Sequence, residues 1–329
     1  MVLIIAEAGV NHNGKISLAK KMIKAASKAG ADIIKFQTFK ADSLLRKNTK
    51  KPNYIKKLIK KKSQFQILKQ LELTKKNFQS LKDYCKKYDI EFMSSPFDNE
   101  SFDIIKKLKV KYIKIPSGEI NNFPLLRLIG KSKKKIIFST GMSDLTEIKD
   151  CLKQLTKNGA KKKDICVLQC NSEYPSPFKD INLRAMNTIA KKFNVNVGLS
   201  DHSVGIEVPI AAVAMGARII EKHVTLNKNL IGPDHRASID FKELSKMVKS
   251  IRNIEYALGS SKKTITRSEI KNKNLVRKSI VAKINIRKGE IFTEKNLTTK
   301  RPGFGTSPNK WDIFLGKKAK KNYLKDQNI

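Results

Sequence analysis

Two lysines interrupt runs of residues that are otherwise apolar. Lys35 lies within the run 33–36 and Lys114 within the run 113–115. Because a lysine in apolar surroundings is costly without an anion beside it, the pair indicates a buried phosphate or carboxylate site. A structural ion pair is the alternative, but serines that follow three predicted strands could complete an anion cradle with backbone N–H groups. These serines are Ser117, Ser139 and Ser200.

Two of the four histidines lie at the ends of neighbouring predicted strands. His202 follows the seventh strand and His223 ends the eighth, so both imidazole rings could converge on one point. Either ring alone is more typical of a satisfied hydrogen-bonding role. Two imidazoles without thiolates form an open site for a divalent metal, with positions left for water and substrate. Asp201 or Glu221 could orient one of the rings.

These side chains belong to a regular alternation of strand-like and helix-like segments. The expected strands are 2–8, 31–38, 90–95, 110–116, 135–139, 165–170, 195–199 and 217–223. The expected helices are 17–29, 74–88, a short one after 99, 124–130, 146–158, 182–192, 208–215 and 241–258. Eight βα units before residue 259 predict an α/β fold, a (β/α)8 TIM barrel, which typically takes about 250 residues. A doubly wound sheet would normally carry a GxGxxG fingerprint after the first strand, where this chain has AGVNHNG.

Polar residues end all eight predicted strands. In a barrel, the active site lies at the carboxyl ends of the strands, so these residues are expected to surround one mouth. They are Glu7; Lys35 and Gln37; Ser94 and Ser95; Lys114, Ser117 and Glu119; Ser139 and Thr140; Asn171, Ser172, Glu173 and Tyr174; Ser200, Asp201 and His202; Glu221 and His223.

The residue composition and the hydrophobic periodicity of the chain change after Gly259. Residues 260–278 are polar and rich in lysine, which is typical of a linker. The segment 277–290 alternates with period two and has a turn at Lys288-Gly289, which indicates short strands. We therefore predict a barrel over 1–259, a linker over 260–278 and a small β-rich domain over 279–329.

Composition excludes several classes of protein. With 40% hydrophobic residues and four cysteines lacking CxxC spacing, the chain is neither disordered nor a disulfide scaffold. The longest apolar run, 208–217, is too short for a membrane span, and no secretory signal is evident. We expect a cytoplasmic protein with no membrane partner. The net charge of +40 is spread over nearly every predicted helix, which favours solvated helix faces over nucleic-acid binding.

The motifs of the chain resemble those of the bacterial sialic acid synthase family over nearly its whole length. They occur in the family's order as IAEAGVNHNG at 5–14, KFQTFK at 35–40, KIPSGE at 114–119, STGM at 139–142, EYP at 173–175, GLSDH at 198–202, EKH at 221–223 and GPDH at 232–235. The sequence KRPGFG at 300–305 resembles the antifreeze-like (SAF) domain that ends these enzymes.

The resemblance implies a reaction and a role for each matching residue. Phosphoenolpyruvate would condense with the open-chain aldehyde of N-acetylmannosamine to give N-acetylneuraminate and phosphate by C–O cleavage. His202 and His223 would bind a divalent metal, usually Mn²⁺, with Mg²⁺ or Co²⁺ tolerated, and Glu7 would position water or transfer a proton. The phosphoenolpyruvate ligands would be Lys35, Lys114, Ser117, Ser139, Ser172 and Ser200. The sugar ligands would be Gln37, Glu119, Tyr174, Asp234 and Arg301.

Arg301 would reach the barrel of a second subunit, which implies a homodimer with exchanged C-terminal domains. Two positions depart from the usual pattern: Ser172 stands where some members carry Asn, and Ser95 where the usual residue is Thr. The family also makes legionaminic acid, from 2,4-diacetamido-2,4,6-trideoxymannose, and pseudaminic acid. We place neuraminate first, legionaminate second and pseudaminate third. Two further alternatives are a synthase for a simple sugar phosphate and a nucleic-acid-binding protein on an inactive barrel.

Overall fold

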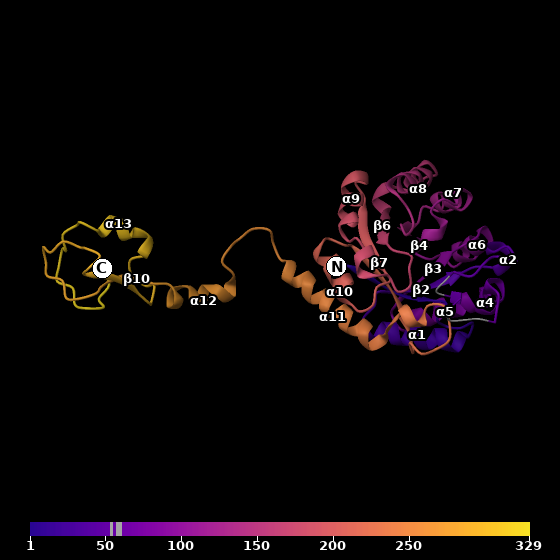
Figure 1. Ribbon diagram of the computed structural model, residues 1–329, viewed down its shortest axis with the longest axis horizontal. Coiled ribbons are helices and arrows are strands. Elements are labelled where there is room, and N and C mark those ends of the chain that lie inside the picture. The colour runs from indigo at the N-terminus through magenta and orange to yellow at the C-terminus, as the bar shows by residue number, and fades with distance from the viewer. Residues whose placement is uncertain (53–54, 57–60) are drawn as a thin grey trace. The chain divides into compact units, whose positions relative to one another are not determined.

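The computed structural model describes residues 1–52, 55–56 and 61–329. The chain divides into two compact units, 1–259 and 260–329. Figure 1 shows the first unit as strands surrounded by helices. Its strands are β1 (Leu3–Gly9), β2 (Ile33–Thr38), β3 (Glu91–Pro96), β4 (Tyr112–Ile115), β5 (Lys135–Ser139), β6 (Ile165–Cys170), β7 (Asn196–Asp201), β8 (Ile219–Thr225) and the short β9 (Ile239–Asp240). Its helices are α1 (Ile16–Lys28), α2 (Ala41–Leu44), α4 (Gln64–Leu71), α5 (Lys75–Lys87), α6 (Asn99–Lys107), α7 (Phe123–Lys131), α8 (Leu145–Lys157), α9 (Arg184–Phe193), α10 (Glu207–Ala214) and α11 (Phe241–Leu258).

The strands β1 to β8 form a parallel barrel, as predicted. Hydrogen bonds join them in the order β3-β2-β1-β8-β7-β6-β5-β4, and β9 adds to β8. Within the described residues, β3 and β4 lie beside each other without a ladder between them, so the barrel is nearly closed. This order excludes the doubly wound sheet. Most helix ends differ from the expected ones by one or two residues, because caps such as Thr74 for α5 and Asp144 for α8 fix them locally.

The interior of the barrel changes from apolar to polar along each strand. A small cluster that includes Ile5, Ile33, Met93, Ile137, Leu168 and Ile219 fills one layer, separate from the large core between strands and helices. Side chains two positions further along a strand point to the same face. The next layer toward the carboxyl ends therefore holds Glu7, Lys35, Ser95, Ser139, Cys170 and Glu221, all buried. This alternation explains why charged residues occur within apolar runs.

The second unit has a short antiparallel sheet around its own core. Strand β10 (Ser279–Ala282) pairs with β11 (Leu297–Lys300), and α13 (Trp311–Phe314) follows. The core includes Ile280, Ile286, Phe292, Leu297 and Tyr323. Gly289 has a φ of +92° at the predicted turn. However, beyond β10 the alternating segment makes only isolated bridges, from Ile286 to Tyr323 and from Ile291 to Lys318. The expected linker contains helix α12 (Arg267–Val276), which begins at a capping box of Thr266 and Glu269.

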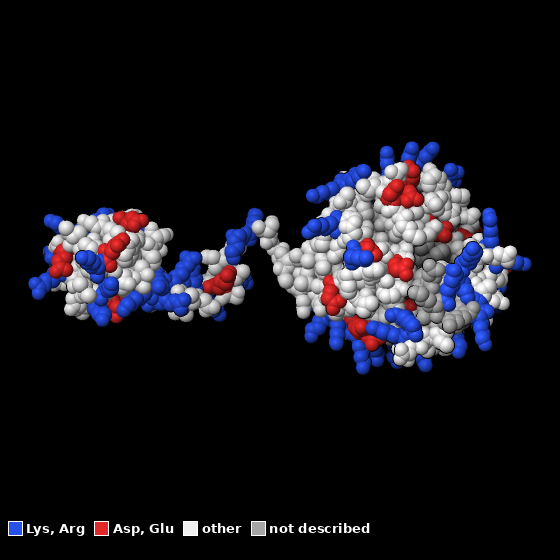
Figure 2. Space-filling view, in the orientation of Figure 1, with Lys and Arg blue, Asp and Glu red and all other residues white. Residues whose placement is uncertain are grey.

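The basic side chains do not gather in one place. Figure 2 shows lysines and arginines around the whole outline of the barrel, with acidic residues among them. On the face in view, the described residues form no continuous basic stripe of the kind that a nucleic-acid backbone requires. Among the described residues, no helix is both long and apolar enough to span a bilayer.

Candidate active site

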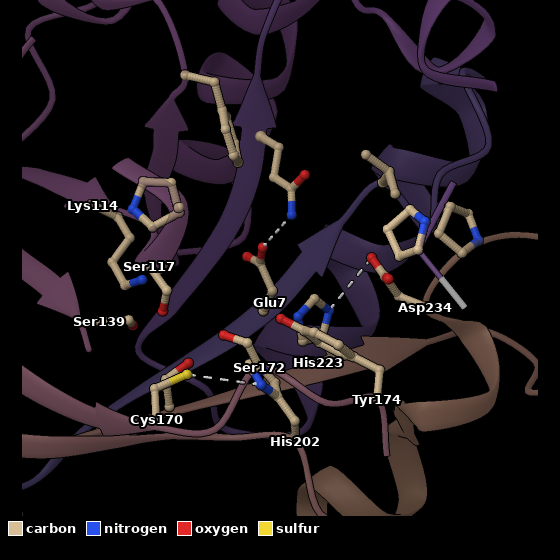
Figure 3. Close-up of a pocket in the computed structure, with 18 of the residues that line it drawn as sticks. Glu7, Lys114, Ser117, Ser139, Cys170, Ser172, Tyr174, His202, His223 and Asp234 are labelled. Carbon is tan, nitrogen blue, oxygen red and sulfur yellow. Dashed lines mark hydrogen bonds and ion pairs between the residues drawn. The ribbon is translucent and has the colours of Figure 1, made fainter. Parts of the chain in front are cut away.

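A pocket of about 430 Å³ opens at the carboxyl ends of the barrel strands. Twelve of the fourteen residues expected at the site line it: Glu7, Lys35, Gln37, Lys114, Ser117, Ser139, Ser172, Tyr174, Ser200, His202, His223 and Asp234. In Figure 3, Lys114, Ser117 and Ser139 lie on one side of Glu7, and His223, Asp234 and Tyr174 lie on the other. The pocket therefore has a basic half with hydroxyl groups and a half with imidazoles and an acid.

The two lysines share one carboxylate in the basic half. Glu221 Oε1 lies 3.4 Å from Lys35 Nζ and 3.4 Å from Lys114 Nζ, and it accepts a hydrogen bond of 3.1 Å from Ser200. Lys35 also lies 3.2 Å from Glu7 Oε1. All four charged groups are almost completely buried. The structural ion pair considered from the sequence is thus present, but it does not use the full capacity of the lysines.

Lys114 is the less satisfied of the two cations. Apart from Glu221, its ammonium group has a hydrogen bond of 3.4 Å to the carbonyl of Ile115, whereas an ammonium can donate three. Burial raises the pKa of Glu7 to about 7, against the opposing charge of Lys35. Burial thus favours the neutral form of Glu7, and each proton that it holds removes one of the two negative charges facing the lysines, which favours an anionic ligand.

Several buried polar atoms of the pocket have no hydrogen-bond partner among the described residues. They are Ser139 Oγ, Glu7 Oε2, Glu221 Oε2 and His223 Nδ1. Such atoms are rare in native proteins and indicate where a ligand donates or accepts. Gly141 allows the neighbouring hydroxyls to approach, since a Cβ there would lie 2.1 Å from Ser172 Oγ and 2.9 Å from Ser117 Oγ. Ser117 Oγ accepts from Gly141 N at 2.9 Å.

The two histidine rings lie together in the other half, with centroids 5.3 Å apart. His202 Nδ1 donates to the carbonyl of Asn171 at 2.6 Å, which leaves Nε2 as the nitrogen with a free lone pair. His223 Nδ1 lies 4.0 Å from Asp234 Oδ2, and Tyr174 stacks near His202 at 4.1 Å. Burial lowers the pKa of His223 well below its usual value, which keeps the ring neutral. A neutral ring and an oriented ring are what metal ligation requires.

These features fit a metal site of two imidazoles, although they do not make a complete one. Within the described residues, no group of three or more His, Cys, Asp or Glu side chains is arranged as a metal cage. That the pair holds an ion with other positions left open stays a prediction. The carbonyl of Asn171 orients His202, whereas Asp201 forms a buried ion pair with Lys222 and accepts from Ser203. Asp201 is therefore not the residue that orients the ring.

Of the remaining residues expected at the site, two line the pocket and two do not. Gln37 Nε2 donates to Glu7 Oε1 at 3.3 Å, and burial raises the pKa of Asp234 to about 6. Glu119 does not line the pocket; its carboxylate accepts from Asn122 at 2.7 Å, in the turn after β4. Arg301 is exposed in the second unit. Its role at the site stays a prediction.

Two lining features were missed from the sequence. Cys170, to which the sequence analysis gave no role at the site, has its Sγ 3.8 Å from His202 Nδ1. Glu221 was expected at the mouth and considered for orienting a ring, but its contact with both lysines was not foreseen. Counting by two from His223 places Glu221 on the inner face, a signal that was available. An apolar wall that includes Phe39, Leu44, Ile55 and Leu68 completes the pocket.

Comparisons with known proteins agree with this geometry. The chain matches the NeuB family over residues 22–263 and the SAF domain over 277–329. It is 51% identical to an N,N'-diacetyllegionaminic acid synthase of Campylobacter jejuni, covering 99% of this chain and 98% of that one. It is 40% identical to a pseudaminic acid synthase of the same species, with 98% and 93% covered. The crystal structure of a sialic acid synthetase from Leptospira borgpetersenii superposes with a TM-score of 0.72 at 36% identity, covering 82% and 90%.

Proposed function

The chain belongs to the NeuB family, and from this premise we propose that it makes N,N'-diacetyllegionaminic acid. It would condense phosphoenolpyruvate with the open-chain aldehyde of 2,4-diacetamido-2,4,6-trideoxymannose and release phosphate. The observation that carries the proposal is a buried basic half beside a histidine pair in one pocket. The order of identities, 51% for a legionaminate synthase against 40% for a pseudaminate synthase, supports this acceptor. The identity of 51%, against 36% for the sialic acid synthetase of Leptospira borgpetersenii, also supports legionaminate over neuraminate, which the sequence analysis put first.

In this reaction the basic half binds phosphoenolpyruvate. Lys35 and Lys114 would contact its phosphate and carboxylate, and the unpartnered Ser139 hydroxyl would donate to them. Ser117, Ser172 and Ser200 would add further hydrogen bonds. C3 of the enol attacks the aldehyde carbon, water adds at C2, and the C–O bond to phosphate breaks. The lysines then compensate the charge of the departing phosphate.

The imidazole half binds the aldehyde end of the sugar. His202 and His223 would hold a divalent ion, with Mn²⁺ first and Mg²⁺ or Co²⁺ as alternatives; when bound, it would polarise the aldehyde oxygen as a Lewis acid. Glu7 and Asp234, whose pKa values lie near 7 and 6, can each hold or release a proton at neutral pH. Gln37 holds Glu7 from one side, and Tyr174 covers His202.

We expect the acceptor to decide the rate of phosphate release. With Mn²⁺ and phosphoenolpyruvate, the diacetamido sugar should give a kcat/KM at least about tenfold above that of N-acetylmannosamine, because one amide contact contributes ~1–2 kcal/mol. Arabinose 5-phosphate should give none. A higher kcat/KM with N-acetylmannosamine would return the product to neuraminate, and release with arabinose 5-phosphate alone would favour a sugar-phosphate synthase.

We also propose a cytoplasmic homodimer in which Arg301 completes the barrel site of the partner. Four large apolar side chains are exposed on the loops that follow β5 to β8, at the pocket end of the barrel: Met142, Phe178, Val204 and Ile231. In the second unit, Phe304 is exposed close to Arg301 in sequence. Exposed apolar residues at the mouth and beside Arg301 support an interface between copies. The free, buried cysteines agree with a reducing compartment.

Mixing of two inactive variants tests this arrangement. His202→Ala and Arg301→Ala should each be inactive alone. After subunit exchange they should recover roughly a quarter of wild-type activity, since about half the dimers are mixed and each then has one intact site. A mixture of His202→Ala with Lys114→Met serves as the control. Each of these variants has a defect in its own barrel, so no mixed dimer has an intact site and the mixture should stay inactive. No recovery in the first mixture would contradict the exchange.

A further inference from the structure

One wall of the pocket is apolar and comes mainly from the connection between β2 and α5. Its residues are Val10, Phe39, Leu44, Ile55, Leu68 and Phe97. They belong to a small hydrophobic cluster that is separate from the main core of the barrel. This satellite core holds Phe39, Leu44, Ile55 and Leu68, which belong to the described part of the connection, beside the pocket. The wall thus presents a fixed apolar surface to whatever fills the space next to the histidine pair and the lysines.

Gln64 is a polar residue set in this wall. It lines the pocket, and only 8% of its surface is exposed. Its Oε1 atom has no hydrogen-bond partner among the described residues. A buried amide oxygen without a donor is unfavourable, and native proteins rarely retain one. The atom is therefore best explained by a donor that arrives with a ligand.

The backbone fixes the position of Gln64. It is the first residue of α4, and Ser63 caps that helix by accepting from Gln66 N at 3.1 Å. Gln66 returns the contact, with its Oε1 accepting from Ser63 N at 2.8 Å. This capping box holds both ends of the first turn. Gln64 takes no part in this capping box, so its side-chain amide is not needed to begin the helix.

The surroundings of Gln64 determine which donor fits. The lysines and histidines of the pocket occupy the positions proposed for phosphoenolpyruvate and the aldehyde, so the apolar wall is left for the distal half of the sugar. Hydroxyl groups there would lose water against Phe39 or Leu68 and gain only one acceptor. An acetamido group offers an N–H to Gln64 and a methyl to the wall. A deoxygenated C6 adds a second methyl. Both features occur together in a 2,4-diacetamido-2,4,6-trideoxy hexose.

We propose that Gln64, within the apolar wall, binds the acetamido group at C4 of the acceptor and so selects the diacetamido-trideoxy sugar over N-acetylmannosamine. The inference rests on the proposed function, because it assigns one part of that acceptor to one residue. It makes Gln64 a specificity residue with no role in the chemistry at C1. Loss of its amide changes the discrimination between sugars and leaves the affinity for phosphoenolpyruvate as it is.

Gln64→Met tests the assignment, because methionine has a similar length and no hydrogen-bonding amide. The kcat/KM for the diacetamido sugar is expected to fall about 10- to 100-fold, because one buried hydrogen bond to the sugar is lost. The kcat/KM for N-acetylmannosamine should stay the same or rise, and the KM for phosphoenolpyruvate should not change. The melting temperature should hold or increase, since the variant removes an unpartnered buried oxygen. Gln66→Ala is the matched control: it weakens the same helix turn without touching the pocket lining, and it should preserve the ratio between the two sugars.

Each outcome separates this inference from the proposed function. If the wild type prefers the diacetamido sugar but Gln64→Met keeps the same ratio, the assignment of Gln64 is wrong and the proposed function stands. An equal loss with both sugars, together with a lower melting temperature, would show a structural role and would also overturn it. If the wild type accepts only N-acetylmannosamine, the proposed function and the subsite fail together.

Discussion

Replacement of His202 by alanine is expected to lower kcat/KM for phosphate release by at least about a thousandfold. The pair of imidazoles can hold an ion only if both rings remain, since the described residues near them form no larger metal cage. A Lewis acid is worth several kcal/mol in the transition state, and each ~1.4 kcal/mol is tenfold in rate. Mn²⁺ binding, followed by calorimetry or by the electron paramagnetic resonance signal of the free ion, should weaken in parallel.

Two further measurements distinguish loss of the metal site from unfolding of the variant or loss of phosphoenolpyruvate binding. Thermal unfolding should show that the variant is folded, and phosphoenolpyruvate should still raise its melting temperature, because Lys114 lies in the other half of the pocket. His223→Ala should give the same pattern. The proposed metal site would be contradicted if the His202→Ala enzyme kept more than a tenth of the wild-type activity, or bound Mn²⁺ as tightly as the wild type.

Lys114→Met is expected to abolish most activity without destabilising the protein. Lys114 is almost completely buried, and among the described residues it faces only one carboxylate. Burial lowers its pKa, against the attraction of Glu221. Removal of this cation leaves Glu221 paired with Lys35 and Ser200, so the variant should unfold at the same temperature as the wild type or higher. Its kcat/KM should fall roughly 100- to 1,000-fold, because one or two charged hydrogen bonds to phosphoenolpyruvate are lost.

The matched control is Lys153→Met, on the exposed face of α8. It removes the same charge from the +40 total but lies outside the pocket lining. It should change kcat/KM by less than about twofold at physiological salt, where distant charges are screened. If both variants lose activity alike, the general field of the protein, and not a built anion site, attracts the substrate. If Lys114→Met is strongly destabilised, the ion pair with Glu221 is structural.

The barrel and the centre of its pocket were predictable from the sequence because both depend on local patterns. Apolar runs gave the strands, and polar interruptions near their ends marked the inner face. Lys35 and Glu221 are examples, each two residues beyond an apolar inward residue. Glu119 shows the limit of this reasoning. Its position after β4 is right for the site, but the turn directs its carboxylate to Asn122.

What the sequence could not show depends on contacts between distant segments. Gln64 and Leu68 belong to a stretch without clear periodicity, and only folding places them beside the pocket. The motifs that carry the family resemblance describe the reaction centre, which enzymes for related sugars share. Gln64, which we propose to contact the distal half of the sugar, lies between the motifs at 35–40 and 114–119. This is why the ranking of neuraminate over legionaminate, made from motif residues, differs from the ranking that the comparisons support.

The most direct test of the central claim is a competition between two acceptors in one reaction. Wild-type protein, Mn²⁺ and limiting phosphoenolpyruvate are mixed with equal amounts of 2,4-diacetamido-2,4,6-trideoxymannose and N-acetylmannosamine, and the products are identified by mass spectrometry. We expect diacetyllegionaminic acid to form in large excess, with one phosphate released per product. An excess of N-acetylneuraminate, or consumption of phosphoenolpyruvate without either nonulosonic acid, would contradict it.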